Sequence, residues 1–321
     1  MLLQHVFSTL LTNGFDHDSI EPLPNTLDIG PLSLPLYGLL IMTGVLLAVW
    51  IGVPEGKKLG IPVDHILDGL LIILPLSLLG TRLWYVIFEW DQFKDYLPSI
   101  LGFQEGGGFT GLTGLAIHGG FITAVVSTII YTRARKINLF SGLDIVAPGF
   151  LIAQSLGRWG NFFNQEAVGG VIGGVENGSA VLDWDAQRSF LSDTLRLPNF
   201  IVNNMFLNPS TGGQGWHYYH PAFLYESVWN ITGLIIVLVL RRTKFVRRGD
   251  MMAFYLIWYS IGRFFIESLR TDSLYLWGTG IRTAQAISIL MILAGIILII
   301  INRKIIPQER YATVLHQNTV K

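Results

Sequence analysis

The feature that most constrains the fold of this chain is a series of long apolar stretches. A helix needs about 20 predominantly apolar residues to cross the hydrocarbon core of a bilayer, and seven stretches approach that length. They cover residues 33–53, 66–88, 112–131, 143–157, 222–240, 251–267 and 284–301. Only 14% of the residues are charged, against about 25% in an ordinary soluble domain. The sequence therefore predicts an all-α polytopic membrane protein with seven transmembrane helices.

The positive charges between these stretches predict the orientation of the chain in the membrane. Cytoplasmic loops are enriched in Lys and Arg. Fourteen such residues follow the first, third, fifth and seventh stretches, and at most six lie on the opposite side. The amino terminus is therefore expected outside and the carboxyl terminus in the cytoplasm. The first 30 residues lack the basic start and short apolar core of a cleavable signal peptide, so the first span is expected to direct insertion.

One connection is much longer than the others. Residues 166–219, between the fourth and fifth stretches, contain paired glycines and Asn-Gly, Pro-Asn and Asn-Pro steps, which are typical of turns and loops. This connection is predicted to form a small extracytoplasmic head inserted into a membrane domain of residues 33–305. Residues 1–32 are expected to form an extracytoplasmic N-terminal segment, and residues 306–321 a cytoplasmic tail.

An unusual group of polar residues lies at the outer end of the fourth stretch, in the run GRWGNFFNQE at residues 157–166. An arginine at the centre of a spanning helix costs about 2.5 to 3.5 kcal/mol, so ionisable groups at membrane depth usually line a cavity or bind a charged ligand. The predicted topology brings further polar residues to the same outer depth. Together these residues are Tyr37, Arg82, His118, Arg158, Asn161, Glu166, Glu226, Arg263 and Glu267. The sequence thus predicts a polar cluster near the outer leaflet.

The sixth stretch has a charged face. Tyr259, Arg263, Glu267 and Arg270 are spaced by four, four and three residues, which places them on one side of a helix. One interpretation is that Arg263 and Glu267 neutralise each other within the membrane. The other is that Arg263 and Arg158 bind a phosphate, because the planar guanidinium donates paired hydrogen bonds to phosphate oxygens. The abundant phosphate at this depth belongs to phospholipid headgroups.

Several of these residues also have ordinary structural interpretations. Arg158 and Arg82 could extend to lipid headgroups, His118 could be a hydrogen-bonded packing residue as readily as a base, and Asp144 and Asn161 could cap helix ends. The chain has no cysteine, which excludes a disulfide, a thiolate metal site and a protein thiol nucleophile. No set of residues with metal-ligand spacing and no P-loop is present, so no metal or cofactor is expected. A net charge of zero argues against a nucleic-acid partner.

Four segments resemble the bacterial prolipoprotein diacylglyceryl transferases and follow the order of that family. They are LAIHGG at residues 115–120, GRWGNFFNQE at 157–166, HPAFLYES at 220–227, and GRFFIESLR at 262–270 with the charged face described above. Tyr37 and Gly38 fit as well, and the resemblance extends over about residues 30–305. The chain departs from the family between the second and third segments. Many members have a basic residue just before His-Pro and a glutamine at the position of Phe223.

The resemblance implies a reaction and its partners. The family transfers the diacylglyceryl group of phosphatidylglycerol to the thiol of the lipobox cysteine in a prolipoprotein signal peptide. Glycerol phosphate is released, at the outer face of the plasma membrane. Arg158 and Arg263 look like the family's phosphate-binding and catalytic arginines, and His118 like a base or headgroup contact. Residues expected to bind phosphatidylglycerol are Arg158, Tyr37, Asn161, Glu166, Tyr259 and Glu267.

The reaction requires a thiolate, and free cysteine has a pKa near 8.5. His118 is the candidate base, in which case His118→Asn should lose activity that higher pH partly restores. A lipid transporter or flippase is the main competing hypothesis, but apart from Asp144 the unusual polar groups lie toward one face of the membrane. An intramembrane protease using a Ser-His pair, with Ser155 or Ser127 as the serine, is a third hypothesis. Neither serine has the glycine-flanked setting of a nucleophile elbow.

Overall fold

The computed structural model describes residues 23–104, 106–108, 111, 114, 116–176, 178–209, 215–276 and 279–319. Most of the predicted N-terminal segment, residues 1–22, lies outside the described residues, as do residues 112, 113 and 115 of the third apolar stretch. The chain divides into two compact units. The larger one comprises Met1–Gly52 and Val146–Ala312, and the smaller one Val53–Ile145 and Thr313–Lys321.

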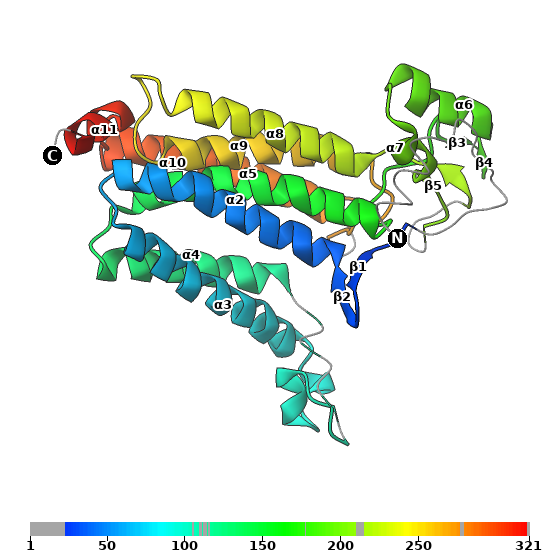
Figure 1. The fold of residues 1–321 in the computed structure, drawn as a ribbon, viewed down its shortest axis with the longest axis horizontal. Helices are drawn as coiled ribbons and strands as arrows, with labels where there is room; N and C mark the ends of the chain where they lie inside the picture. Colours follow the sequence, from blue (N-terminus) through cyan, green and yellow to red (C-terminus); the bar gives the residue numbers. More distant parts are fainter. Residues whose placement is uncertain are drawn as a thin grey trace. The chain divides into compact units, whose positions relative to one another are not determined.

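Long helices make up most of the larger unit, and in Figure 1 they run lengthwise beside one another. They are the first part of α2 (Leu36–Lys58), most of α5 (Leu139–Phe163), α8 (Ala222–Leu240), α9 (Asp250–Glu267) and α10 (Thr283–Ile300). A short π-helix, η4 (Ile301–Ile305), extends α10. A hairpin of β1 (Thr26–Ile29) and β2 (Leu32–Pro35) precedes α2, and α11 (Tyr311–Thr319) follows α10.

Helices α8 and α9 are joined by a pair of tryptophans. The rings of Trp229 and Trp258 stack with their centroids 4.3 Å apart, and each indole N–H donates to the backbone carbonyl of the other residue, at 2.9 and 3.0 Å. A Cβ at Gly262 would lie 2.3 Å from the Trp229 ring, and one at Gly233 would lie 2.4 Å from the Trp258 ring. Only glycine leaves room for the two indoles, so this contact sets the register of α8 against α9.

A small head lies between α5 and α8 in the chain (Figure 1). Its elements fall within residues 166–219. They are β3 (Val175–Glu176), β4 (Ser179–Ala180), α6 (Trp184–Ser189), the π-turn η3 (Phe190–Thr194), α7 (Asn199–Asn203), β5 (Phe206–Leu207) and β6 (His217–Tyr218). Strands β3 and β4 form one antiparallel pair, and β5 and β6 another. The buried apolar core of the head includes Phe162 of α5 and Phe223 of α8, so the head is packed onto the ends of both helices.

The smaller unit is built on the helix pair α3 (Val63–Phe88) and α4 (Ile117–Ala134), with two 3₁₀ turns, η1 (Trp90–Gln92) and η2 (Leu97–Leu101), in their connection. Arg82 is 4% exposed. Its guanidinium donates to the carbonyls of Ser99 at 2.6 Å, Ile100 at 2.8 Å and Gly114 at 3.2 Å. Arg82 therefore holds this connection together, and both earlier interpretations, headgroup contact and ligand binding, are wrong for it.

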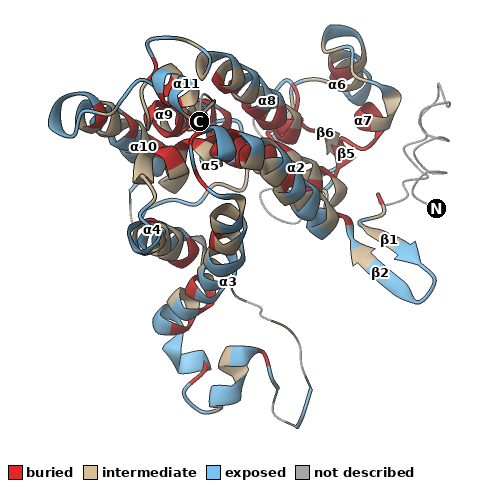
Figure 2. Cartoon of the chain, turned by 60° about the vertical axis from the view of Figure 1, so that its left-hand side comes forward, coloured by how far each residue is buried: buried red, intermediate tan, exposed pale blue. Residues whose placement is uncertain are grey.

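Among the described residues, five helices are long and apolar enough to cross a membrane: α2, α3, α5, α8 and α10 with its π-helix. In Figure 2 exposed faces run along α2 and α10. Large apolar side chains lie there, with Leu46 66%, Trp50 72% and Leu290 65% exposed. Apolar surface of this extent is what lipid contact requires, as in a polytopic membrane protein.

The other two predicted stretches form α4 and α9, which have 18 residues each and are not among the five. Helix α9 contains three charged residues, Asp250, Arg263 and Glu267. The helix that contains the fourth stretch, residues 143–157, is longer than the stretch itself. Helix α5 continues to Phe163, because GRWGNFF has no helix-terminating proline and its Phe162 packs into the core of the head. Asn161 thus lies in the last turn of the helix, where its side chain bonds to Arg158 and Glu166 and does not cap the helix end.

Candidate functional site

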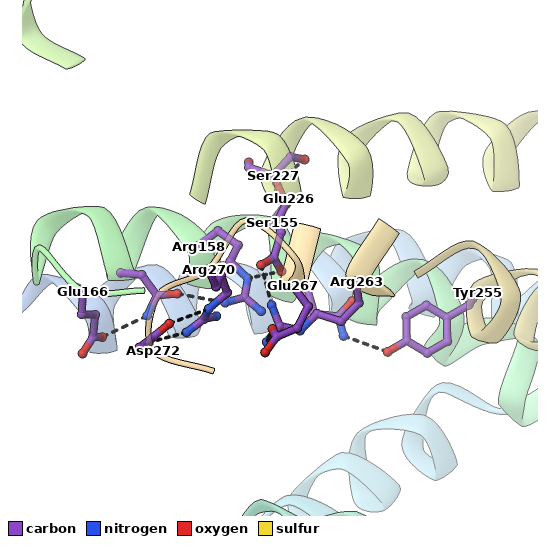
Figure 3. A network of polar contacts seen from close by, with 12 residues as sticks. Ser155, Arg158, Glu166, Glu226, Ser227, Tyr255, Arg263, Glu267, Arg270 and Asp272 are labelled. Atoms are coloured by element: carbon purple, nitrogen blue, oxygen red, sulfur yellow. Dashed lines mark hydrogen bonds and ion pairs between the residues drawn. The ribbon is translucent and has the colours of Figure 1, made fainter. Parts of the chain in front are cut away.

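A buried carboxylate joins two arginines from different helices (Figure 3). Arg158 Nε of α5 lies 2.7 Å from Glu226 Oε2 of α8, and Arg263 Nη1 of α9 lies 2.8 Å from Glu226 Oε1. The Glu226 side chain is 5% exposed, whereas those of Arg158 and Arg263 are 18% and 16% exposed. Removing one partner of a buried ion pair typically costs about 3 to 5 kcal/mol. The three side chains therefore behave as one unit with its arginines partly accessible.

Further contacts extend this cluster along α9 and α5. Arg263 Nη2 lies 2.6 Å from Glu267 Oε2, one helical turn away, so the neutralising pair predicted from the sequence is present. Arg158 Nη1 donates to Asn161 Oδ1 at 3.3 Å, and Asn161 Nδ2 donates to Glu166 Oε1 at 2.9 Å. Five of the predicted site residues thus belong to one network with Glu226. They are Arg158, Asn161, Glu166, Arg263 and Glu267.

The turn that follows α5 directs Glu166 back toward Asn161. Gln165 and Ala167, on either side of Glu166, have φ angles of 52° and 56°, in the left-handed region that non-glycine residues rarely adopt. Such conformations cost on the order of 1 to 3 kcal/mol each and concentrate at functional sites. The turn lines a small pocket that also includes Asn204 of the head. The strained backbone therefore places three polar side chains, those of Asn161, Gln165 and Glu166, on the wall of a pocket.

A second ion pair lies just beyond the end of α9. Arg270 Nε and Nη2 donate to the two carboxylate oxygens of Asp272 at 2.9 and 2.7 Å. Burial by itself would raise the pKa of Asp272, but the hydrogen bonds and charge of Arg270 outweigh it and hold that pKa below its usual value. For Arg270 burial acts in the opposite direction and would lower the pKa, but the nearby carboxylates of Asp272, Glu226 and Glu267 keep that pKa above its usual value. Arg270 is thus electrostatically part of the cluster.

The position of Arg270 differs from the prediction. Helix α9 ends at Glu267, so Arg270 does not continue the charged face of that helix. Instead its backbone forms a bridge with Gly169, at the base of the head. Arg282, before α10, donates through Nη1 to the carbonyl of Glu267. The carboxyl end of α9 is therefore held by the head on one side and by the start of α10 on the other.

Three predicted residues remain. The Tyr37 ring packs on α5, since a Cβ at Gly160 would lie 2.4 Å from Tyr37 Cδ2, one residue from Asn161. The ring of Tyr259 stacks on that of Tyr255, with centroids 5.8 Å apart. His118 is an exposed residue at the start of α4, in the smaller unit. A role for His118 or Tyr259 at the cluster stays a prediction.

The sequence prediction included Glu226 in the polar cluster but gave it no role. Its pairing with the arginines could have been inferred from the number of charges, because two arginines at one depth in a membrane need carboxylates beside them. The structure argues against Ser155 as the nucleophile of the protease hypothesis. Ser155 Oγ is buried and lies 2.8 Å from Ser227 Oγ, so its hydroxyl is paired with another serine and not with a histidine.

Comparison with known proteins agrees with the resemblance in the sequence. A family model described as prolipoprotein diacylglyceryl transferase matches residues 24–301. The chain belongs to this family. Proteins called phosphatidylglycerol--prolipoprotein diacylglyceryl transferase are 44% identical in Bacillus anthracis (strain CDC 684 / NRRL 3495), over 86% of this chain and 90% of that protein, and 43% identical in Bacillus cereus (strain Q1), over 87% and 91%. The family match spans every residue of the cluster.

Proposed function

We propose that the protein transfers the diacylglyceryl group of phosphatidylglycerol to a cysteine thiol of a prolipoprotein, forming a thioether and releasing glycerol phosphate. Family membership and the names of the relatives support this reaction. The structural observation that carries it is the pair of arginines with partly exposed side chains, Arg158 and Arg263, bridged by Glu226. Paired N–H donors of this kind suit the phosphate of a lipid headgroup.

The arginines stabilise the leaving group. As the bond between the glyceryl carbon and the phosphate oxygen breaks, negative charge grows on the phosphate. Guanidiniums fixed beside it interact more strongly with that charge in the transition state than in the substrate, which lowers the barrier. Glu226 and Glu267 orient Arg263, and Glu226 and Asn161 orient Arg158. The folded protein therefore positions these donors before the substrate arrives.

The remaining predicted residues contact the substrates. Asn161 and Glu166, on the wall of the pocket beside Arg158, would bind the glycerol hydroxyls of the headgroup. Tyr37 packs against the same part of α5 and would contact the lipid there, and Tyr259, one turn from Arg263 in α9, would contact the glyceryl backbone. His118 is a base or a headgroup contact. The second substrate is the lipobox cysteine of a prolipoprotein signal peptide.

We further propose seven membrane spans, with α4 as the third and α9 as the sixth. The ion pairs of Arg263 with Glu226 and Glu267 offset the cost of placing these charges at membrane depth. The basic run at residues 241–248 precedes the start of α9, while Arg263 and Glu267 lie near its other end. By the distribution of positive charge, the cluster and the head then face the outside of a bacterial plasma membrane, with the amino terminus outside and the carboxyl terminus in the cytoplasm.

A flippase or transporter would need polar groups along a path through the membrane. The ion pairs of the cluster lie near one end of α5, α8 and α9, which favours a reaction at one face.

The test is mass spectrometry of a lipobox peptide incubated with the purified protein in phosphatidylglycerol micelles. The expected result is a gain of one diacylglyceryl mass on the cysteine, absent with Arg158→Ala. An unmodified peptide together with binding of labelled lipid would refute the transferase and support lipid transport.

A further inference from the structure

The charges around the cluster balance before any substrate binds. Arg158 and Arg263 contact the carboxylates of Glu226 and Glu267. Beyond them, the charged groups attached to this core in the described part of the chain are Arg270 with Asp272, Arg282 on the Glu267 carbonyl, and Glu166 through Asn161. The arginines among these residues thus equal the carboxylates in number.

A bound phosphodiester upsets this balance by adding one negative charge. An uncompensated charge in surroundings with little water is costly, and proteins usually relieve it by a change of protonation. The cluster with lipid bound therefore favours uptake of one proton. The same reaction has one proton to dispose of, because the substrate thiol must become a thiolate before it attacks.

Glu226 is the carboxylate on which the added charge acts most directly. Both of its oxygens contact guanidiniums, Oε2 that of Arg158 and Oε1 that of Arg263, so a phosphate that takes paired donors from both arginines competes with Glu226 for them. Glu267 contacts a single guanidinium, that of Arg263, which lies four residues earlier on the same helix. Glu166 is exposed to solvent, where a carboxylate stays ionised without a cation.

Resting on the proposed function, we propose that Glu226 accepts the proton of the substrate thiol. The S–H proton passes to a Glu226 oxygen, the sulfur electron pair forms the bond to the glyceryl carbon, and the electrons of the carbon–oxygen bond leave with the phosphate. The glycerol phosphate produced has one more negative charge than the diester, and a phosphate monoester accepts a second proton with a pKa of about 6. It therefore takes the proton from Glu226, which returns to its two arginines.

The surroundings of Glu226 fit this cycle. The charged groups that face it are Arg158 from α5, Arg263 and Glu267 from α9, and Arg270 with Asp272 from the segment after α9. Arginines do not release protons in proteins, so they act only through their charge. The competing base is His118, in the smaller unit.

The test compares Glu226→Gln with the wild type on two lipobox peptides, one with cysteine and one with selenocysteine, in phosphatidylglycerol micelles. A selenol is ionised at neutral pH and needs no base. Because proton transfer by a positioned side chain contributes about 10²- to 10⁴-fold, Glu226→Gln is expected to lose at least about 100-fold with cysteine. With selenocysteine it should recover to within about tenfold of the wild type, whereas Arg263→Lys should be slow with both peptides.

Several outcomes would overturn the assignment. Equal losses with both peptides would mean that Glu226 only holds the arginines, and an unimpaired rate with cysteine would remove its role altogether. His118→Asn is measured in parallel, since recovery with selenocysteine in that variant alone would assign the proton transfer to His118. A wild type that modifies neither peptide would refute the proposed function itself.

Two further variants separate chemistry from folding. Thermal stability and binding of labelled phosphatidylglycerol are measured for Glu226→Gln, and Glu226→Asp serves where the amide variant does not fold. Aspartate keeps the carboxylate, so its ratio of cysteine to selenocysteine rates should match that of the wild type even if both rates fall. If Glu226→Asp, like Glu226→Gln, reacted much more slowly with cysteine than with selenocysteine relative to the wild type, proton transfer by the carboxylate would be contradicted. Thr232→Val, an exposed position of α8, is the control for substitution in this helix.

Discussion

Replacing Arg158 by lysine separates the geometry of the guanidinium from its charge. In the structure Arg158 uses Nε for Glu226 at 2.7 Å and Nη1 for Asn161 at 3.3 Å. A lysine ammonium can keep the ion pair with Glu226, but it is a single point of charge and cannot also donate in a fixed fork to Asn161 and a phosphate. Arg158→Lys should therefore fold normally and fail in the reaction.

The size of the loss follows from the role proposed for this side chain. Removing one fixed donor to a developing negative charge costs about 10²- to 10³-fold in kcat, or about 2.7 to 4 kcal/mol. Because the interaction strengthens in the transition state, kcat should fall more than KM for phosphatidylglycerol rises. Stability should change by less than about 1 kcal/mol, whereas Arg158→Ala removes one partner of a buried pair and should cost about 3 to 5 kcal/mol.

The assay measures initial rates of lipobox-peptide modification by mass spectrometry at several concentrations of phosphatidylglycerol, together with the thermal stability of each variant in detergent. Arg196→Lys, an exposed arginine of the head, is the matched control and should behave as the wild type. If Arg158→Lys retained near-normal turnover, the paired-donor role would be wrong. A rate loss accompanied by an equally large loss of stability would show that Arg158 is mainly structural.

Three further predictions concern stability. Trp258→Phe removes the indole donor to Trp229 and should lower the unfolding free energy by roughly 1 kcal/mol, measured by thermal unfolding in detergent; no change would mean that stacking alone joins α8 and α9. Neither polar atom of the buried Asn230 amide has a hydrogen-bond partner in the described part of the chain, so Asn230→Leu should raise stability by about 1 to 2 kcal/mol, and a fall would show that the amide is hydrogen-bonded in the membrane. The folded pKa of Asp272 lies below its unfolded value of about 3.9, so its ion pair stabilises the fold above that pH and is lost as the pH falls through the folded pKa. Asp272→Asn should therefore be less stable than the wild type at pH 7, by roughly 1 to 3 kcal/mol, and the difference should vanish in strong acid; a difference independent of pH would contradict this origin.

The cluster could be predicted from the sequence only in part. Depth was predictable, because a membrane boundary and the rise of a helix place Arg158, Arg263 and Glu226 at one level without knowledge of packing. Spacing within one helix was predictable as well, which is why the contact between Arg263 and Glu267 was foreseen. The partners of Arg82 could not be predicted, because they are backbone carbonyls in a connection between helices. A pattern of side chains in the sequence does not indicate such contacts.

What the sequence by itself determined is the set of long apolar helices and the level at which their charged residues lie, since both depend on local composition and helical periodicity. The tertiary structure decided which groups touch. Depth leaves free the rotation of each helix about its axis, and that rotation is set by contacts between helices, such as the stacked indoles of Trp229 and Trp258 in their glycine recesses. Only this packing turns Glu226 between Arg158 and Arg263, and a carboxylate shared by two helices cannot be recognised in the sequence of any one of them.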